Sequence, residues 1–548
     1  MYNNTPRTMI VTTALPYANG NIHLGYILEA IEADIWVNFQ KMRGHTCYFI
    51  AGSDAHGTPI MIQAEKQGLS PEAFIEQMSR EQLADIEQFG IRFDNFYTTH
   101  SPENEALVSE IYRNLKDSGA IIHKTIYQAY DPLKKMFLPD RYLKGTCPRC
   151  KTPEQYGDNC EACGATYSAS ELIDPKSVLS DVSPETRATE HLFFDLPQYA
   201  DKLKQWLSGP HVAKEIQNKM QEWFEAGLQA WDISRDAPYF GFKIPGEEDK
   251  YFYVWLDAPV GYMASFQHFC QNHPELHFAD FWKKGSETEL YHFIGKDIVY
   301  FHTLFWPAVL MASQHRLPTQ VFVHGFVTVN GEKMSKSRGT FITAKDYLAK
   351  LDPEYLRYYF AAKLNGAIED IDLNFEDFMQ RVNADLVGKI INIAARTASF
   401  IHKFFDNQLA ATLNNPALLA EFMGKETEIA EQYEKRDYAR AIREITALAD
   451  KANEWIAVEK PWQIAKEQGG VLLLQEIAST ALNLFRILIV YLKPILPRLA
   501  VSVENFLEIP PLKWQDIETP LLKHQIKTFS PLMTRIESTQ IAEWIQNA

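Results

Sequence analysis

The stretch at residues 14–26 reads Ala14-Leu15-Pro16-Tyr17-Ala18-Asn19-Gly20-Asn21-Ile22-His23-Leu24-Gly25-Tyr26, and it decides the fold of this chain. The apolar run at 8–12 that precedes it is typical of a short buried strand, and the apolar residues that follow it recur with helical spacing as far as Phe39. We therefore predict a strand-to-helix turn, which Pro16 stiffens and Gly20 bends. A second apolar run at 47–51 completes a βαβ unit.

This turn also indicates where a ligand would bind. In a doubly wound parallel sheet, ligands lie outside the carboxyl ends of the strands, where helix N-termini attract phosphate. The turn contains neither a GxGxxG fingerprint nor a Walker lysine, which excludes a dinucleotide turn and a P-loop. His23 lies beside Gly25, at which a ligand could approach the backbone, and it suggests a donor to a nucleotide phosphate. A helix-start histidine without chemistry is the alternative that this stretch alone leaves open.

Composition bounds the class of protein. A chain of 548 residues, 46% hydrophobic and 13% aromatic, should form three or four domains with large cores. Its formal net charge of −16 argues against a non-specific polyanion binder but leaves room for a local basic face. No N-terminal signal peptide is visible, and six cysteines do not form a disulfide scaffold, so we expect a cytoplasmic protein. The apolar stretch at 471–500 is interrupted by charges, which favours a buried helix pair over a membrane span.

Four of the cysteines have metal-ligand spacing. Two C-x-x-C pairs lie nine residues apart: Cys147, Cys150, Cys160 and Cys163. Two such knuckles can close a tetrahedral site of four thiolates with no open position, so we predict one structural zinc ion. Iron in the same cage and a redox dithiol pair are the alternatives. The segment around them, from residue 120, shows short β segments at 121–122, 125–127 and 136–138, which indicates an insertion into the sheet domain.

The second half of the chain returns to α/β patterning near Trp231 and then becomes helical. Strand-like runs occupy 251–255, 291–295 and 320–325, and Asn330-Gly331 signals a type I′ hairpin turn. The hairpin leads into residues 332–339, a loop with lysines, an arginine and serines that suits a polyphosphate, although a solvated charged turn is equally possible. Beyond about residue 350, amphipathic patterns at 383–405, 415–434, 437–459 and 471–492 predict a helical bundle.

Taken together, these motifs resemble the class I aminoacyl-tRNA synthetases, and within them the bacterial-type methionyl-tRNA synthetases. The resemblance runs from about residue 8 to beyond 500. It rests on Ala-Leu-Pro-Tyr-Ala-Asn-Gly, Asp-Ala-His-Gly-Thr-Pro-Ile, Val-Trp-Leu-Asp-Ala-Pro, His-Phe-Ile-Gly-Lys-Asp-Ile and Lys-Met-Ser-Lys-Ser. It implies a Rossmann-like parallel sheet (1–118 and 231–328), an inserted domain (119–230) with a zinc knuckle at about 139–165, a KMSKS and stem-contact region (329–385) and a helical anticodon-binding domain with a tail (386–548).

The resemblance also implies roles for individual residues. The catalytic residues would be His23, Tyr26, Lys333 and Lys336. ATP would contact His23, Gly25, Gly295, Asp297 and Lys336, and Arg235 matches a family position that is linked to the reactive site. Asp54 would hold the α-ammonium of methionine. The rest of the methionine site would comprise Ala14, Leu15, Tyr17, Trp255, Ala258, Pro259, Tyr262, Ile298, Phe301, His302 and Trp306. Asn392, Arg396 and Trp462 would read the CAU anticodon, since single-stranded bases stack on aromatic rings and hydrogen-bond to Arg and Asn.

The implied reaction is that of a methionine–tRNA ligase, which uses ATP with Mg²⁺ as substrate. The methionine carboxylate attacks the α-phosphate of ATP, and the 3′-terminal adenosine of tRNA(Met) then takes the acyl group, for initiation and elongation of translation. One departure concerns Tyr26, because the family signature normally ends there in a second histidine. Because the chain ends near the expected end of the bundle, we expect a monomer.

Two rival interpretations remain. A synthetase for leucine, isoleucine or valine would usually carry a large editing insertion, for which we consider a chain of 548 residues too short. A catalytically impaired RNA-binding paralogue would keep the zinc knuckle and the bundle, and Tyr26 is the feature that favours it. Lys333, Lys336 and Asp54, which are intact, argue for an active enzyme.

Overall fold

The structure is a computed structural model that describes residues 5–157, 160, 162–165, 167, 169–334, 341–467 and 470–546. Its centre is a five-stranded sheet in which all neighbouring strands are parallel, in the order β14-β13-β1-β2-β3. The strands are β1 (Thr8–Thr13), β2 (Thr46–Ser53), β3 (Asn95–Thr98), β13 (Glu289–Gly295) and β14 (Gln320–His324). The chain extends the sheet first on one side of β1 and later on the other, so the predicted doubly wound sheet is confirmed.

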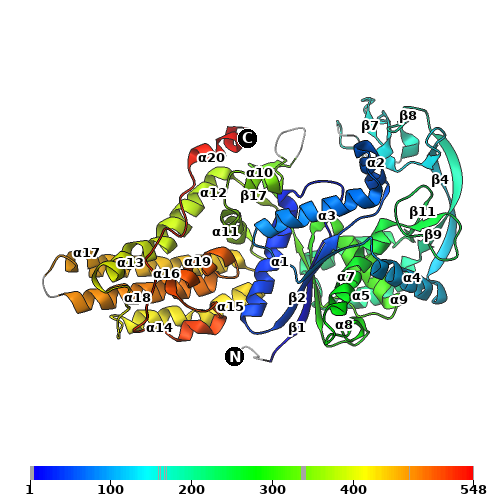
Figure 1. Cartoon of the computed structure of the whole chain (residues 1–548). Coiled ribbons are helices and arrows are strands. Elements are labelled where there is room, and N and C mark those ends of the chain that lie inside the picture. Colours follow the sequence, from blue (N-terminus) through cyan, green and yellow to red (C-terminus); the bar gives the residue numbers. More distant parts are fainter. Residues whose placement is uncertain are drawn as a thin grey trace.

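Helices cover both faces of this sheet (Figure 1). Because side chains alternate along a strand, Met9 and Val11 of β1 face one core and Ile10 faces the other. The first core is closed by α1 (Leu24–Met42), and the second by α4 (Pro102–Asp117), α7 (Val254–Gln271) and α9 (Trp306–Ala312). Two further helices, α2 (Thr58–Gln67) and α3 (Pro71–Gln88), follow β2.

The inserted domain is built on a long antiparallel pair, β4 (Ile121–Asp131) and β9 (Glu185–Phe194), with β5 (Met136–Phe137) and β10 (Trp231–Asp232) beside them. A second small sheet carries the cysteine knuckles and comprises β6 (Leu143–Thr146), β7 (Gln155–Tyr156) and β8 (Ile173–Ser177). Two helices, α5 (Ala200–Leu207) and α6 (Lys214–Ala226), lead back toward the central sheet.

Three sequence predictions about this region were wrong in detail. The short β segments at 121–122 and 125–127 form one continuous strand, because pairing with β9 extends across the intervening polar residues. Trp231 lies in β10, which pairs with β9 of the inserted sheet. The aromatic run at 251–255 is divided: β12 (Lys250–Phe252) pairs with β11 (Ser234–Asp236), and Trp255 already lies in α7.

The predicted hairpin is confirmed. β15 (Val327–Val329) and β16 (Glu332–Lys333) are antiparallel, and β15 also pairs with β17 (Ile371–Leu373). Both turn residues have positive φ, 50° at Asn330 and 83° at Gly331, as a type I′ turn requires. Residues 335–340, which contain Lys336, lie outside the described residues.

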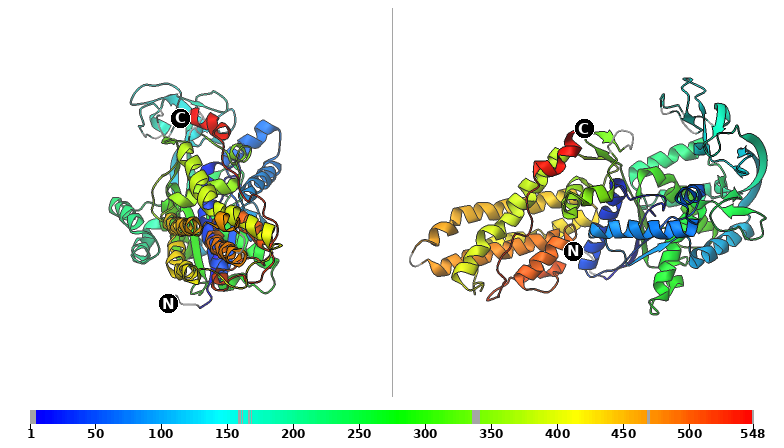
Figure 2. Two further views of the ribbon diagram at one scale, coloured as in Figure 1. Left: turned by 90° about the vertical axis from the view of Figure 1, so that its left-hand side faces the viewer. Right: turned by 45° about the horizontal axis from the view of Figure 1, so that its top comes forward.

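The C-terminal part is a helical bundle, as predicted, and it lies beside the sheet domain along the long axis of the molecule (Figures 1 and 2). The remaining helices are α8 (Phe278–Trp282), α10 (Ala344–Leu348), α11 (Pro353–Lys363), α12 (Phe375–Arg381), α13 (Asn392–Phe404), α14 (Pro416–Gly424), α15 (Glu426–Glu434), α16 (Tyr438–Glu459), α17 (Pro461–Ile464), α18 (Val471–Leu492), α19 (Pro497–Leu507) and α20 (Ser538–Gln546). α18 is the one described helix long and apolar enough to cross a membrane, but 83% of its most apolar stretch is buried inside the bundle.

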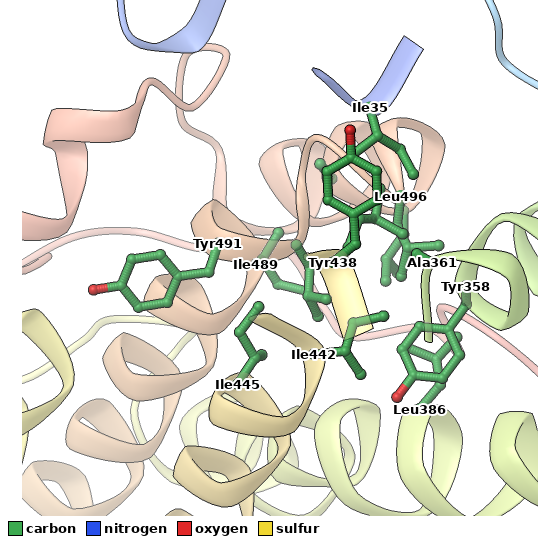
Figure 3. Close-up of a cluster of buried hydrophobic side chains, with 14 of the residues drawn as sticks. Ile35, Tyr358, Ala361, Leu386, Tyr438, Ile442, Ile445, Ile489, Tyr491 and Leu496 are labelled. Atoms are coloured by element: carbon green, nitrogen blue, oxygen red, sulfur yellow. The ribbon is translucent and has the colours of Figure 1, made fainter. Parts of the chain in front are cut away.

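One core joins the sheet domain to the bundle. Figure 3 shows Ile35 of α1 close to Tyr438 of α16 and Leu496, which follows α18. Two ion pairs cross the same junction: Asp34 with Arg357 at 2.6 Å, and Glu32 with Arg436 at 3.0 Å. Because helix α1 begins at the turn that decides the fold, this junction ties the position of the turn to the bundle.

Candidate active site

A cavity of about 900 Å³ opens at the carboxyl ends of the central strands. Its walls come from the turns after β1, β2, β13 and β14, from the start of α7 and from the inserted domain. It is lined by many of the residues predicted for the site: Ala14, Leu15, Tyr17, His23, Gly25, Tyr26, Asp54, Arg235, Trp255, Gly295, Asp297, Ile298 and Lys333. The expectation that ligands lie at this edge of the sheet is therefore matched by a cavity of ligand size.

His23 is the N-cap residue of α1. Its Nδ1 accepts a hydrogen bond from the backbone N–H of Gly25 at 3.1 Å, so a neutral ring carries its proton on Nε2. A Cβ atom at position 25 would lie 2.9 Å from the His23 ring and 3.2 Å from the methyl carbon of Met334. Glycine is therefore required by close packing between the turn and the loop that follows β16.

Tyr26 lies one turn further along α1 and also lines the cavity. Its hydroxyl and the Thr13 hydroxyl are 3.3 Å apart. Burial raises the pKa of Tyr26 above its ordinary value, so the hydroxyl stays protonated at neutral pH. It can act there as a neutral hydrogen-bond donor.

Asp54 directly follows β2, at the floor of the cavity. The backbone N–H of Asp54 donates to Pro16 O at 2.9 Å, and its carbonyl accepts from Ala18 at 2.8 Å, which ties it to the first turn. Its Oδ1 atom is buried and has no hydrogen-bond partner among the described residues. Burial, assisted by the charge of Asp257, raises the pKa of Asp54 well above its usual range. A buried carboxylate of this kind is completed by a cation.

The predicted aromatic residues form a packed wall behind the cavity. The Trp255 and Phe301 rings are stacked, with centroids 3.8 Å apart and planes at 11°. Tyr262 Oη and His302 Nε2 are 2.9 Å apart, and Trp306 Nε1 donates to His292 at 3.3 Å. Several predicted residues lie in this buried layer and not on the cavity surface: Ala258, Pro259, Tyr262, Phe301, His302 and Trp306.

Gly295 is the last residue of β13, and Asp297 lies in the 3-10 turn that follows it. A Cβ atom at Gly295 would be 2.6 Å from Asp297 Oδ1, so the absence of a side chain lets the carboxylate lie across the strand end. Arg235 also lines the cavity, where its guanidinium lies 3.6 Å from the Tyr253 ring centroid and pairs with Asp232 at 3.0 Å. Lys333 lines the same cavity at the end of the hairpin.

Sequence reasoning missed a buried ion pair in this cavity. His324 Nε2 and Glu29 Oε2 are 3.1 Å apart, and His324 Nδ1 faces the Gly325 carbonyl oxygen at 2.7 Å. Burial by itself lowers the pKa of His324, but the hydrogen bond that its Nε2–H donates to the Glu29 carboxylate raises this pKa to about 9. Glu29 Oε1 also accepts from the backbone N–H of Ala14 at 2.7 Å, so the pair holds the end of β1. A polar residue at the carboxyl end of a predicted strand was the signal that could have identified His324.

The inserted domain contributes a part of the wall that the sequence did not indicate. Asp140, Arg141 and Tyr142 form a 3-10 turn beside the cavity. The Gly157 N–H donates to Asp140 O at 3.1 Å, which connects this turn to the cysteine knuckles. No local pattern in the sequence points to this contact, because it depends on how the insertion folds back onto the sheet domain.

The four predicted cysteines meet in one cluster. Their Sγ atoms all lie within 4.8 Å of one another, with Cys147 and Cys163 at 3.9 Å and Cys150 and Cys160 at 3.5 Å. A tetrahedral zinc–thiolate site requires Sγ atoms about 3.8 Å apart. Backbone N–H groups donate to Cys147 Sγ and Cys160 Sγ at 3.4 Å, and such bonds stabilise thiolates. The donor set therefore fits a zinc ion.

The residues predicted to read an anticodon lie at a distance from the cavity, in the bundle. Asn392 and Arg396 are one turn apart on α13, and Trp462 is the second residue of α17. The Arg396 guanidinium lies 5.0 Å from the Trp462 ring centroid, and Trp462 is 37% exposed. An exposed indole beside a guanidinium is a surface on which a nucleic acid base could stack.

Comparisons with known proteins agree with this architecture. Residues 9–398 match the family model described as tRNA synthetases class I (M), and residues 408–547 match the anticodon binding domain of methionyl tRNA ligase. Among solved structures, the chain is similar to methionyl-tRNA synthetase of Mycobacterium tuberculosis in complex with methionyl-adenylate, at 22% identity and a TM-score of 0.79 over 96% of this chain and 99% of that one. The apo form of the same synthetase matches at 20% identity and a TM-score of 0.73, over 98% and 100% of the two chains.

The sheet, the cavity at its edge and the first of these matches define a class I tRNA synthetase, and hence an aminoacyl-tRNA ligase. Since the matching models are those of the methionine enzymes and together span most of the sequence, the chain belongs to the methionyl-tRNA synthetase family.

Proposed function

We propose that this protein joins methionine to tRNA(Met) in two steps at the 900 Å³ cavity. In the first step, the methionine carboxylate attacks the α-phosphate of ATP, which gives methionyl-adenylate and pyrophosphate. In the second step, a hydroxyl of the 3′-terminal adenosine takes the acyl group and releases AMP. Neither step needs a protein nucleophile, so positioning and electrostatic stabilisation supply the rate.

The observation that carries this proposal is the unsatisfied carboxylate of Asp54. A buried Oδ1 without a partner, at the floor of a cavity, matches a ligand that brings its own cation. The α-ammonium of an amino acid is such a cation, and its binding would return the pKa of Asp54 toward its usual range. The apolar, polarizable wall of Trp255 and Phe301 beside it suits a thioether side chain.

The remaining predicted roles fit around this anchor. The proton on His23 Nε2 and the hydroxyl of Tyr26 would donate to phosphate oxygens, and the ammonium of Lys333 would stabilise charge that develops on the leaving pyrophosphate. Lys336 is assigned the same task on the basis of the KMSKS motif. Gly295 and Asp297 would hold the adenosine, and Mg²⁺ would enter with ATP.

The four-cysteine cluster is proposed to bind one structural zinc ion. The ligands would be the thiolates of Cys147, Cys150, Cys160 and Cys163. A bound zinc ion would fix the knuckles, because it closes a cage of four thiolates. Through Gly157 and Asp140 the knuckles would then keep Arg141 and Tyr142 against the cavity.

Recognition of tRNA(Met) is proposed to occur at Asn392, Arg396 and Trp462, with the bases of the CAU anticodon stacking on the indole and accepting hydrogen bonds from the guanidinium and amide. We further propose the domain division given by the sequence, a monomer and a cytoplasmic location. Light scattering over a range of concentrations tests the monomer, and a concentration-independent dimer would contradict it.

The deciding experiment is methionine-dependent ATP–pyrophosphate exchange by the purified chain without tRNA. We expect exchange with methionine, and none with leucine, isoleucine or cysteine. If a folded, zinc-loaded protein gives no exchange with any amino acid, the catalytically impaired RNA-binding paralogue becomes the better interpretation, since Tyr26 departs from the family signature.

A further inference from the structure

A second cavity, of about 530 Å³, lies at the opposite edge of the central sheet. Its walls include the loop at 284–286, which precedes β13, and the segment at 314–319, which precedes β14. The amino-terminal ends of the strands therefore face it, whereas the 900 Å³ cavity lies at their carboxyl ends. None of the described residues lines both cavities.

This second cavity is basic. Its walls carry Lys202, Lys284 and Arg316 together with the imidazoles of His211 and His315, and no aspartate or glutamate lines it among the described residues. The chain as a whole has a formal charge of −16, so a recess without carboxylates is a local departure from the average. We call it the basic cavity.

Two buried donors in the basic cavity lack partners. Arg316 is only 9% exposed; its Nε donates to Leu317 O at 3.3 Å and its Nη2 to Thr319 Oγ1 at 3.0 Å, but Nη1 has no acceptor among the described residues. The indole N–H of Trp206, which is 7% exposed, has none either. Buried donors without acceptors cost stability, so a ligand that reaches these two lining residues and supplies acceptors would offset that cost.

No ion pair to Arg316 is found among the described residues. Burial lowers the pKa of Arg316 to about 10, and the charge of Glu289, which opposes this, is shared with Arg7, its partner at 2.6 Å. A buried guanidinium is ordinarily found with an anion, because an uncompensated buried charge is strongly unfavourable. Arginine also presents several donors to a phosphate or carboxylate group.

We propose that the basic cavity is a second ligand site, which binds a small molecule that bears a phosphate group. Arg316 and Lys284 neutralise the phosphate, and Lys202 adds charge at the wall. The stacked rings of Trp206 and His211, with centroids 5.1 Å apart and planes at 10°, form an apolar side for the remainder of the molecule. The volume exceeds what a phosphate ion alone requires, which favours a phosphorylated organic compound.

The test uses the full chain, inorganic phosphate as probe and the indole N–H resonances of its eleven tryptophans as site-specific reporters. Trp206→Phe assigns the signal of the basic cavity, and Trp255→Phe assigns that of the 900 Å³ cavity. At constant ionic strength, we expect phosphate to shift the Trp206 signal saturably. Shifts confined to Trp255 would show that phosphate binds only at the proposed ATP site and would overturn the proposal.

Two variants test the residues that are assigned to the phosphate. Arg316→Gln and Lys284→Gln should each weaken phosphate binding at Trp206 by about tenfold or more, because a hydrogen bond to a charged group is lost. Lys283→Gln is the matched control. Lys283 is the neighbour of Lys284 in the chain, but its ammonium pairs with Asp280 at 2.9 Å and it does not line the basic cavity. Lys284 is exposed, so its variant remains informative if Arg316→Gln fails to fold. Equal affinities in Lys284→Gln and Lys283→Gln would refute the assignment.

Discussion

Nδ1 of His23 accepts a hydrogen bond from the backbone N–H of Gly25 at 3.1 Å, so the residue that caps helix α1 also directs its protonated nitrogen away from the helix. One imidazole thus has two separable tasks. Nδ1 satisfies an N–H group at the helix start, and the proton on Nε2 is the one that we propose to act in catalysis.

The substitution His23→Asn should separate these tasks. The asparagine oxygen can still cap α1, but the donor at Nε2 is lost, so the rate of adenylate formation should fall by about 10²–10³ while the free energy of unfolding changes little. His23→Ala should lose the same activity and, in addition, about 1 kcal/mol of stability. Pyrophosphate exchange and urea denaturation measure the two effects.

The control is Ser101→Ala, which removes the N-cap of α4. In this cap the backbone N–H of Asn104 donates to Ser101 Oγ at 3.3 Å, and Ser101 does not line the 900 Å³ cavity. It should cost similar stability without loss of exchange. Full activity in His23→Asn would contradict a catalytic role for Nε2.

Tyr26 should act as a neutral donor. Tyr26→Phe should lower the rate of adenylate formation about tenfold or more, because a hydrogen bond to a charged phosphate is lost. Thr13→Val, which removes only the hydroxyl that lies 3.3 Å from Tyr26, should have a much smaller effect. Tyr26→His should change the rate by no more than a few-fold; an increase of several orders of magnitude would mean that tyrosine is not a competent replacement at this position.

The Glu29–His324 pair predicts a pH-dependent contribution to stability. The pKa of His324 is raised from 6.5 to about 9 in the folded protein, so its contribution is fully present below pH 6.5 and is lost as the pH rises through 9. A shift of this size corresponds to about 3 kcal/mol. Urea denaturation should therefore show His324→Gln to be clearly less stable than the parent protein at pH 6, with the difference shrinking by pH 10. A difference that grows with pH would disprove the ion pair.

The cysteine cluster predicts one zinc ion per chain. Elemental analysis should find about one equivalent in the parent protein and in Cys47→Ala, whose thiol is buried in the core of the sheet domain. Cys160→Ala should lose the metal, and pyrophosphate exchange should fall, because the turn with Arg141 and Tyr142 is no longer held against the cavity. Retention of stoichiometric zinc by Cys160→Ala would contradict the four-thiolate site.

Trp462 should contribute to tRNA binding and not to methionine activation. Trp462→Ala should raise KM for tRNA about 5–150-fold, as expected for the loss of about 1–3 kcal/mol of base stacking, and leave pyrophosphate exchange unchanged. Phe404→Ala, which removes another exposed aromatic ring at the end of α13, is the control and should leave KM unchanged. Loss of exchange in Trp462→Ala would indicate a structural role instead.

Local patterns predicted much of this molecule because the interactions that produce them act within a few residues. The turn at 14–26 follows from strand and helix periodicity, and β1 and α1 flank it in the structure. Asn330-Gly331 produced the predicted hairpin because both residues tolerate positive φ. Predictions failed where pairing partners were distant in the chain, as for Trp231 and β9.

The class of fold and the cysteine cluster could be read from the sequence, since each depends on periodicity or spacing over a few residues. The resemblance to a known family supplied most of the residues that line the candidate site. The tertiary contacts bring His324 to Glu29, bring Arg141 to the cavity from the inserted domain, and place Arg316 in a basic cavity that no carboxylate lines among the described residues. These contacts join segments far apart in the chain. Their charge states depend on burial and on neighbours that no local pattern reveals.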